Sequence, residues 1–414
     1  MSSSGDDDVP RAENIPEAGD GESRDPPSPS SKKSRLGQFY SARWVDLLDG
    51  LSVPRGLVVV EPFVGAGDLL RACPDGATLE LYDIDPPPGG AGGTVRRDTI
   101  ADPPDYGGRF VLTNPPYLAR NKSADKAPYD RYGLNDLYKC FVAELTAQDA
   151  AGGILVLPVN FWSGVRRADV ALRARFLRKY RVVRLNVFDG RMFPDTTAAV
   201  CAFQFAARGP PPAAGAAPRR DDDVVSLEVW CYPEATAAAK TGRPLPPTRH
   251  VWDLRVAPDG MAMPGGHVHR RALRAAATGD VRVERLTRDN DTPANEPYKC
   301  DLVLHAVDGK GGDDDGSRRI RLEVVRPGAR VVDRTPRLSG RSSASFLVRP
   351  PLDAATQRAL CTRFNAYLEE QRAAYHSLFL PAFREFTRKR IPFSLAFRLI
   401  ASFVSEGAWI SITP

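Results

Sequence analysis

The chain of 414 residues predicts an α/β domain built on a mostly parallel sheet, followed by a smaller α+β part. Uninterrupted apolar stretches at 57–60, 110–113 and 153–158 are typical of strands buried on both faces. These stretches alternate with segments of helical pattern between residues 57 and 205, which favours parallel strands joined by helices. A run rich in Pro, Ala and Gly at 209–223 then interrupts the pattern.

The elements of the first domain can be placed in chain order from their patterns. An amphipathic helix is expected through Trp44, Val45, Leu47 and Leu48, ahead of the first strand. The predicted strands are 57–60, 77–82, a strand ending near Asp98, 110–113, 153–158, 182–187 and 198–205. The predicted helices are 69–72, 134–147 and the basic segment 166–180. Beyond residue 224 the signals are short strand-like stretches and a long helical segment at 352–375.

Composition divides the chain into four predicted parts. Residues 1–35 are rich in Ser, Pro, Gly and Asp and cannot bury enough apolar surface to offset ordering entropy, so a disordered tail is expected. The α/β domain is expected at 36–208, a linker at 209–223 and a second domain at 224–414.

Charge and cysteine usage exclude several classes of protein. No apolar run reaches the ~18 residues of a membrane-spanning helix, so no membrane partner is expected. The six cysteines form no CxxC pair and no cluster with histidine, which indicates a reducing intracellular compartment and no metal site. The net charge of +6 is compatible with a nucleic-acid partner.

A glycine turn follows the first predicted strand. Glu61 ends that strand, and Gly65 and Gly67 lie between it and a short helix. Glycines in such a turn let the backbone approach a ligand, and a carboxylate at a strand end can bind an amine or a hydroxyl. The sequence therefore predicts a nucleotide-type site here, although glycine turns also occur for packing alone.

Further candidate ligand groups follow the next two predicted strands. Asp83 ends the second strand, where doubly wound folds bind ribose hydroxyls, and Ile84 could lie on an adenine ring. Asp98 comes where a third strand would end and could accept from an adenine amino group. A capping or turn aspartate is the alternative interpretation of Asp83.

The stretch Asn114-Pro115-Pro116-Tyr117 directly follows the fourth predicted strand. Each proline fixes its own φ and restricts the residue before it, so this turn is stiff. It can present the Asn114 side-chain oxygen and the Pro115 carbonyl as converging acceptors, with Tyr117 as a stacking face. Those groups suit a planar amino group that receives a methyl group; an ordinary proline-rich surface turn is the alternative.

Taken together, these motifs and their order resemble those of S-adenosylmethionine-dependent DNA adenine-N6 methyltransferases. The short distance from Gly67 to Asn114 leaves no room for a recognition domain between them, which is similar to the gamma-class enzymes of TaqI type. The sequence around Phe193 is similar to the gamma-class loop whose Phe holds the flipped base. The resemblance covers about residues 36–205.

The resemblance implies a Rossmann-like methyltransferase sheet with helices on both faces and a C-terminal α+β target-recognition domain. It also implies S-adenosyl-L-methionine as cofactor, double-stranded DNA as partner and a flipped adenine as target. A monomer in the cytoplasm or nucleus of a host cell is expected. The implied cofactor-binding residues are Phe39, Tyr40, Glu61, Gly65, Gly67, Asp83, Ile84 and Asp98. The implied catalytic residues are Asn114, Pro115, Pro116 and Tyr117, and Tyr117 and Phe193 would sandwich the target base.

Two other classes of function stay open from the sequence. Asn-Pro-Pro-Tyr also occurs in methyltransferases that modify RNA bases or a protein glutamine. A non-catalytic nucleic-acid-binding protein could retain the same fold, although the presence of Glu61, Asp83 and Asn114 together argues against it. No carboxylate and lysine cluster of a fused nuclease is evident.

Overall fold

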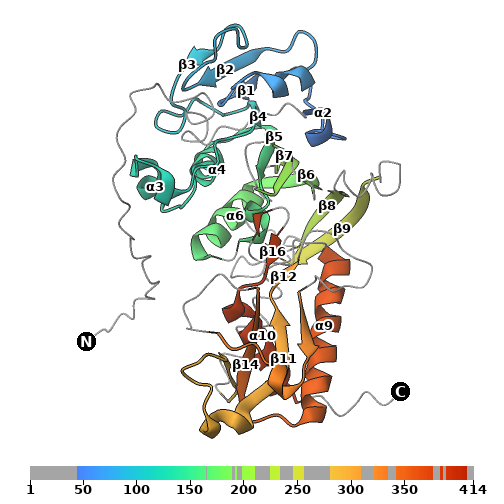
Figure 1. Ribbon diagram of the computed structural model, residues 1–414. Coiled ribbons are helices and arrows are strands. Elements are labelled where there is room, and N and C mark those ends of the chain that lie inside the picture. Colours follow the sequence, from blue (N-terminus) through green and yellow to red (C-terminus); the bar gives the residue numbers. More distant parts are fainter. Residues whose placement is uncertain are drawn as a thin grey trace, which may run out of the picture.

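The computed structural model describes residues 44–164, 166–188, 192–193, 198–209, 224–233, 246–255, 280–308, 320–333, 342–375, 383–385 and 388–407 (Figure 1). The predicted tail, Phe39, Tyr40 and nearly all of the predicted linker lie outside the described residues.

A nine-stranded sheet forms the larger part of the molecule, in the order β3-β2-β1-β4-β5-β7-β6-β8-β9. Strands β1 to β5 pair in parallel, whereas β7 runs antiparallel to both β5 and β6. This confirms the predicted α/β class with a mostly parallel arrangement in its first half. The strands are β1 (Val59–Glu61), β2 (Leu79–Asp83), β3 (Val95–Arg96), β4 (Phe110–Thr113), β5 (Gly152–Pro158), β6 (Tyr180–Phe188), β7 (Val200–Ala207), β8 (Val224–Tyr232) and β9 (Thr248–Arg255).

The strand order reverses between β1 and β4. From β1 the chain moves outward through β2 and β3, and it then returns to place β4 on the other side of β1. In doubly wound sheets such a switch point opens a crevice outside the carboxyl ends of the two strands. A ligand site is therefore expected where β1 and β4 end, at Glu61 and Thr113.

Helices cover both faces of this sheet, as predicted. The face that carries Leu112 and Val156 packs against Leu47 and Leu69. The face that carries Val111 packs against the long helices α4 and α6. The helical segments are α2 (Trp44–Leu47), η1 (Asp68–Ala72), η2 (Arg120–Lys122), α3 (Ala127–Tyr132), α4 (Leu137–Ala147), α5 (Asn160–Ser163) and α6 (Arg167–Lys179).

Regular alternation of strand and helix is absent from the first half of the sheet. The helix expected after β1 is the short 3-10 segment η1, and no helix joins β2 to β3 or β3 to β4. Three prolines and several glycines follow β2 at 86–93, and proline and glycine are the poorest helix formers. The parallel pairing of β1, β2 and β3 therefore forms through loops.

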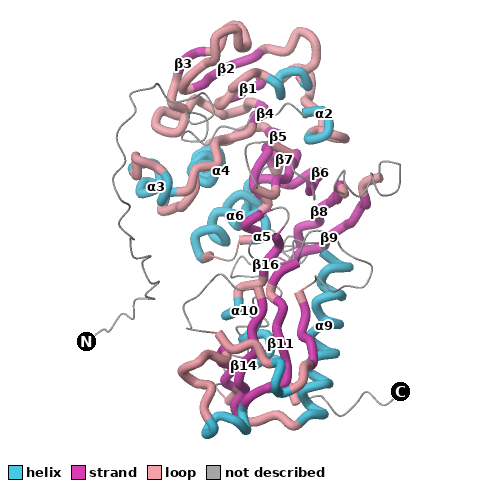
Figure 2. The backbone as a smooth tube through the Cα atoms, in the orientation of Figure 1, coloured by secondary structure: helices cyan, strands magenta, loops and turns pink. Residues whose placement is uncertain are grey.

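The C-terminal part is built on a four-stranded antiparallel sheet in the order β10-β14-β11-β13. Helix α9 packs on β13 and β11, and α10 packs on β10 and α9 (Figure 2). This α+β arrangement is the one predicted for the C-terminal part. Its elements are β10 (Arg282–Arg285), η3 (Pro293–Tyr298), β11 (Lys299–His305), β12 (Val307–Asp308), β13 (Arg321–Val324), η4 (Pro327–Ala329), β14 (Ser343–Arg349), α9 (Ala354–Tyr375), β15 (Phe383–Glu385), β16 (Arg388–Arg390) and α10 (Phe393–Ser405).

Strands β8 and β9 extend the large sheet, although the sequence pattern grouped them with the C-terminal part. β8 pairs in parallel with β6, and β9 pairs antiparallel with β8. Leu227 and Val229 of β8 are fully buried in a cluster that also contains Leu302 and Leu304 of β11. The cores of the two sheets are therefore continuous, and the division of the chain into domains stays a prediction.

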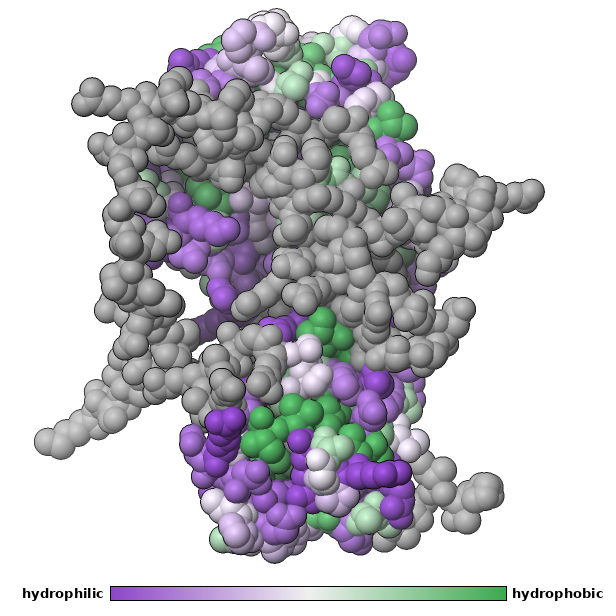
Figure 3. Space-filling view, viewed as in Figure 1, coloured by the Kyte–Doolittle hydropathy of each residue, from purple (hydrophilic) through white to green (hydrophobic). Residues whose placement is uncertain are grey.

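The surface seen in Figure 3 is mixed, with an apolar area over the C-terminal part surrounded by hydrophilic residues. No helix in the described part of the chain is both long and apolar enough to cross a membrane.

Candidate active site

Glu61, the last residue of β1, is a buried carboxyl group at the switch point. Its side chain is 1% exposed, and its Oε1 atom accepts hydrogen bonds from Thr113 Oγ1 at 2.5 Å and from the Phe63 amide at 3.3 Å. Burial raises the pKa of Glu61 to about 8, although both hydrogen bonds act in the opposite direction. Thr113 ends β4, so this hydrogen bond joins the ends of the two strands that flank the switch point.

The glycine turn after β1 is held in place by Asp83. The Asp83 carboxylate, 2% exposed, accepts the Gly65 amide at 2.8 Å with one oxygen and the Asp85 amide at 2.8 Å with the other. Gly67 has φ of 80°, and a Cβ atom there would lie 3.2 Å from the Cβ of Ala91. Only glycine fits this conformation readily, so the turn brings bare backbone to the ends of β1 and β2.

Two further predicted residues lie beyond the ends of β2 and β3. Ile84 directly follows β2 and is 40% exposed, which leaves an apolar side chain available to a ligand. Asp98 lies two residues after β3 and is exposed. Its Oδ1 atom accepts the amides of Ile100 and Ala101 at 3.1 and 3.2 Å. Asp98 therefore also braces its own turn.

The Asn-Pro-Pro-Tyr turn starts directly after β4. Asn114 and Tyr117 are half-buried, and Pro115 is buried. The Tyr117 hydroxyl lies 2.5 Å from Asn114 Oδ1 and 2.8 Å from the carbonyl oxygen of Val156 in β5. Desolvation raises the pKa of Tyr117 well above its usual value, so this hydroxyl stays protonated and acts as a donor.

The predicted aromatic pair of Tyr117 and Phe193 is brought together. The two ring centroids are 6.5 Å apart and the ring planes are inclined by 62°, an edge-to-face contact. Phe193 is 2% exposed. A base stacked between two rings needs parallel planes, so a base could enter here only after the rings separate and turn.

The structure also reveals polar residues near the turn that sequence patterns did not single out. Tyr138, in the first turn of α4, lies with its ring centroid 6.0 Å from that of Tyr117. The next residue, Lys139, forms an ion pair with Asp169 of α6 at 2.7 Å. The only local signal was the polar pair Asn135-Asp136 at the start of the predicted helix 134–147, and the observed α4 begins just after this pair, at Leu137.

Of the predicted site residues, Glu61, Gly65, Gly67, Asp83 and Asn114 gather at the carboxyl ends of neighbouring strands. Phe39 and Tyr40 cannot be placed, because they lie outside the described residues. Within the described residues, no group of three or more His, Cys, Asp or Glu side chains is arranged to hold a metal ion. The arrangement places carboxylates and a glycine turn at the ends of β1 and β2, and an amide with aromatic rings at the end of β4.

Comparison with known proteins gives only distant likenesses. No protein-family model matches the chain, and no match was found among curated proteins. The methyltransferase subunit of a type I restriction-modification system from Streptococcus thermophilus is 14% identical, with a TM-score of 0.33 over 47% of this chain and 48% of its own. The structure of a DrdV–DNA complex is 14% identical, with a TM-score of 0.37 over 68% of this chain and 36% of its own.

A 23S rRNA methyltransferase, ErmE, is 17% identical, with a TM-score of 0.30 over 41% of this chain and 68% of its own. The chain covers about half or less of the length of the other two proteins. At such TM-scores the likeness identifies neither the reaction nor the substrate of this chain.

Proposed function

We propose that the protein is a site-specific DNA adenine methyltransferase, which transfers a methyl group from S-adenosyl-L-methionine to N6 of a flipped adenine in duplex DNA. One observation carries the proposal. The glycine turn braced by Asp83 and the Asn-Pro-Pro-Tyr turn lie at the carboxyl ends of neighbouring strands, and the Glu61–Thr113 hydrogen bond links them. A cofactor site and an amino-group acceptor would thus meet at one edge of the sheet.

The residues at the ends of β1 and β2 fit the proposed cofactor. A buried carboxyl group suits a ligand with an amine, and a turn that only glycine fits readily suits close approach of a bulky ligand. When bound, S-adenosylmethionine supplies an electrophilic methyl group on a sulfonium. Glu61, Gly65 and Gly67 would line its methionine and ribose side. Asp83 would bind the ribose, Ile84 and Asp98 the adenine, and Phe39 and Tyr40 would border the methionine end.

Asn114 and the Pro115 carbonyl would activate the target nitrogen. The N6 lone pair is delocalised into the adenine ring, and two acceptors that bind its hydrogens draw the nitrogen towards a pyramidal geometry. Preorganised acceptors of this kind work by positioning and electrostatics, without a strong base. In this structure the Tyr117 hydroxyl donates to Asn114 Oδ1. The target amino group would take the place of that hydroxyl as the donor to Asn114.

Stacking would offset part of the cost of taking the base out of the duplex. Extrusion costs a few kcal/mol, and a flipped base is held by stacking on aromatic side chains. Tyr117 and Phe193 would supply those faces once their edge-to-face contact opens. The C-terminal part, residues 224–414, would read the DNA sequence through the major groove while basic side chains contact phosphates.

The test is transfer of labelled methyl from S-adenosylmethionine to purified duplex DNA, RNA and protein in parallel reactions. The expected product is N6-methyladenine in DNA, identified by nucleoside analysis. Label in RNA or in a protein glutamine, with DNA unmodified, would refute the proposed substrate. Asn114→Ala is expected to abolish turnover while calorimetry still detects cofactor binding. Loss of cofactor binding in this variant would mean that Asn114 belongs to the cofactor side.

A further inference from the structure

Several buried polar atoms in the region of helices α4, α5 and α6 have no hydrogen-bond partner. They belong to residues at the start of α4, in α5 and in α6: Asp136 Oδ1, Tyr138 OH, Ser163 Oγ and Arg173 Nε. Such atoms cost folding free energy, and native proteins keep few of them without a ligand or ordered water to complete them. Tyr138, whose ring contacts that of Tyr117, is therefore a candidate for a use at the site.

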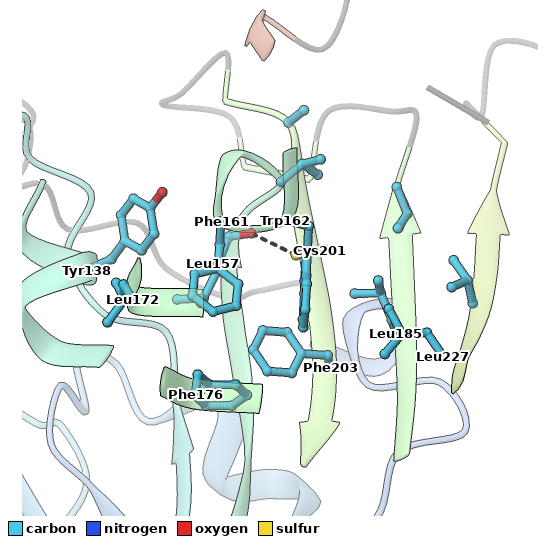
Figure 4. Close-up of a cluster of buried hydrophobic side chains, with 14 of the residues drawn as sticks. Tyr138, Leu157, Phe161, Trp162, Leu172, Phe176, Leu185, Cys201, Phe203 and Leu227 are labelled. Atoms are coloured by element: carbon cyan, nitrogen blue, oxygen red, sulfur yellow. Dashed lines mark hydrogen bonds between the residues drawn. The ribbon is translucent and has the colours of Figure 1, made fainter. Parts of the chain in front are cut away.

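Tyr138 contacts the proposed base pocket directly, because its ring packs against that of Tyr117. Its side chain is 2% exposed, and the centroid of its ring is 6.0 Å from that of Tyr117, with the planes inclined by 82°. Figure 4 shows the Tyr138 hydroxyl directed away from Leu172. It points towards the edge of the sheet at which the strand that carries Leu185 terminates. That strand, β6, runs parallel to β5, so this is the carboxyl edge.

A buried ion pair fixes Tyr138 in this position. Lys139 Nζ donates to Asp169 Oδ1 at 2.7 Å and to Asn135 Oδ1 at 2.9 Å, and the ion-paired side chains are 8% and 9% exposed. The same ammonium lies 5.7 Å from the centroid of the Tyr138 ring. Buried ion pairs add little stability, but they hold groups in one geometry. The start of α4 is therefore preorganised although the Tyr138 hydroxyl has no protein partner.

We propose that Tyr138 determines substrate specificity by donating a hydrogen bond from its hydroxyl to a ring nitrogen of the target base beside the amino group. The inference rests on the proposed function and extends it from the amino group to the ring of the base. Adenine offers acceptor nitrogens, N1 and N7, on either side of its amino group, whereas guanine carries a hydrogen on N1. A phenol donor that faces N1 would favour adenine over guanine, whereas N7 accepts a hydrogen bond in both bases.

The experiment compares wild type with Tyr138→Phe on duplexes whose target base is adenine, 1-deazaadenine or 7-deazaadenine. The variant is expected to lower kcat/KM on adenine about 10- to 100-fold, the effect of losing one buried hydrogen bond. On one of the two analogues, the kcat/KM of wild type should fall by a similar factor. On that same analogue, Tyr138→Phe should lower kcat/KM no further. Which analogue behaves so identifies the ring nitrogen.

Tyr180→Phe is the matched control. The Tyr180 hydroxyl is also buried, but it donates to the carbonyl oxygen of Gln148 at 3.0 Å, at the start of β6 and away from the carboxyl edge. Tyr180→Phe should lower Tm and leave kcat/KM unchanged. Tyr138→Phe should leave Tm unchanged or slightly higher, because it removes a hydroxyl without a partner, and should lower kcat/KM.

Three outcomes would overturn the inference: normal activity of Tyr138→Phe, equal slowing of wild type and variant by both analogues, or loss of cofactor binding with a lower Tm. Normal activity would mean that the hydroxyl binds an ordered water molecule and not the base. Loss of cofactor binding with a lower Tm would mean that Tyr138 has a structural role. Failure of the proposed function is separate, because wild type would then methylate no base in DNA.

Discussion

At the scale of single residues, Glu61 and Tyr117 are two groups at the candidate site whose pKa values burial raises. The Glu61 carboxyl is buried beside Thr113, and its raised pKa favours the protonated form at neutral pH. The Tyr117 hydroxyl donates to Asn114 Oδ1, so this side-chain oxygen is already hydrogen-bonded within its own turn. Burial of the Glu61 carboxyl group costs folding free energy, and buried groups with shifted pKa values are typical of functional sites.

The raised pKa of Glu61 predicts how stability depends on pH. Its ordinary pKa is 4.5 and the folded value is about 8, so the unfolded state loses this proton first as pH rises. The free energy of unfolding should therefore fall between pH 4.5 and about 8, by at most about 1.4 kcal/mol per pH unit from this group. Urea unfolding at pH 5, 6.5 and 8 measures the slope.

Glu61→Gln should reduce that slope, because the amide does not titrate. Asp136, whose pKa burial raises to about 7, acts in the same direction, so some slope should remain. An unchanged slope in Glu61→Gln would mean that the carboxyl titrates normally in the folded protein.

At the scale of elements, helices α4 and α6 are joined by the Lys139–Asp169 ion pair. Both side chains are nearly fully buried, and Arg173 of α6 donates to the carbonyl oxygens of Phe161 and Gly164 around α5. These contacts tie the segment after β5 to the helix that presents Tyr138. The wall of the proposed base pocket thus depends on contacts between helices that are far apart in sequence.

Lys139→Met is expected to destabilise the protein by about 3–5 kcal/mol, because it leaves the Asp169 carboxylate buried without its partner. Urea unfolding measures the loss. The double variant Lys139→Met with Asp169→Leu should recover most of it, since replacing both charges by apolar groups is often neutral. A double variant as unstable as the single one would show that the ion pair itself is required for folding.

At the scale of the whole molecule, one contiguous buried cluster joins the nine-stranded sheet to the C-terminal sheet. Val229 of β8 and Leu302 of β11 both belong to it. Strands β8 and β9 follow the predicted linker in sequence, yet they complete the first sheet. Shared buried surface couples the unfolding of the parts that share it.

Differential scanning calorimetry is therefore expected to show a single unfolding transition for the full chain. Saturating S-adenosylmethionine should shift that whole transition to higher temperature. At a cofactor concentration of 100 times Kd, the free energy of unfolding should rise by about 2.7 kcal/mol. Two transitions, of which only one responds to the cofactor, would show that the two sheets unfold independently.

The amino-acid sequence by itself determined the local features of this protein. Buried apolar runs fixed where β1, β4 and β5 lie, and Gly67 and the prolines after Asn114 fixed the turns that follow two of them. These signals are local, because steric restriction and burial act on neighbouring residues. They were sufficient to predict the α/β class and the edge of the sheet at which the candidate residues gather.

Only the tertiary structure decided which distant residues meet. The pairing of β8 with β6, the Lys139–Asp169 ion pair and the direct contact of Tyr117 with Phe193 join segments far apart in the chain. No periodicity encodes such pairs, since they depend on how whole elements pack. The orphan hydroxyl of Tyr138 is visible for the same reason, because only packing shows that a buried group has no partner.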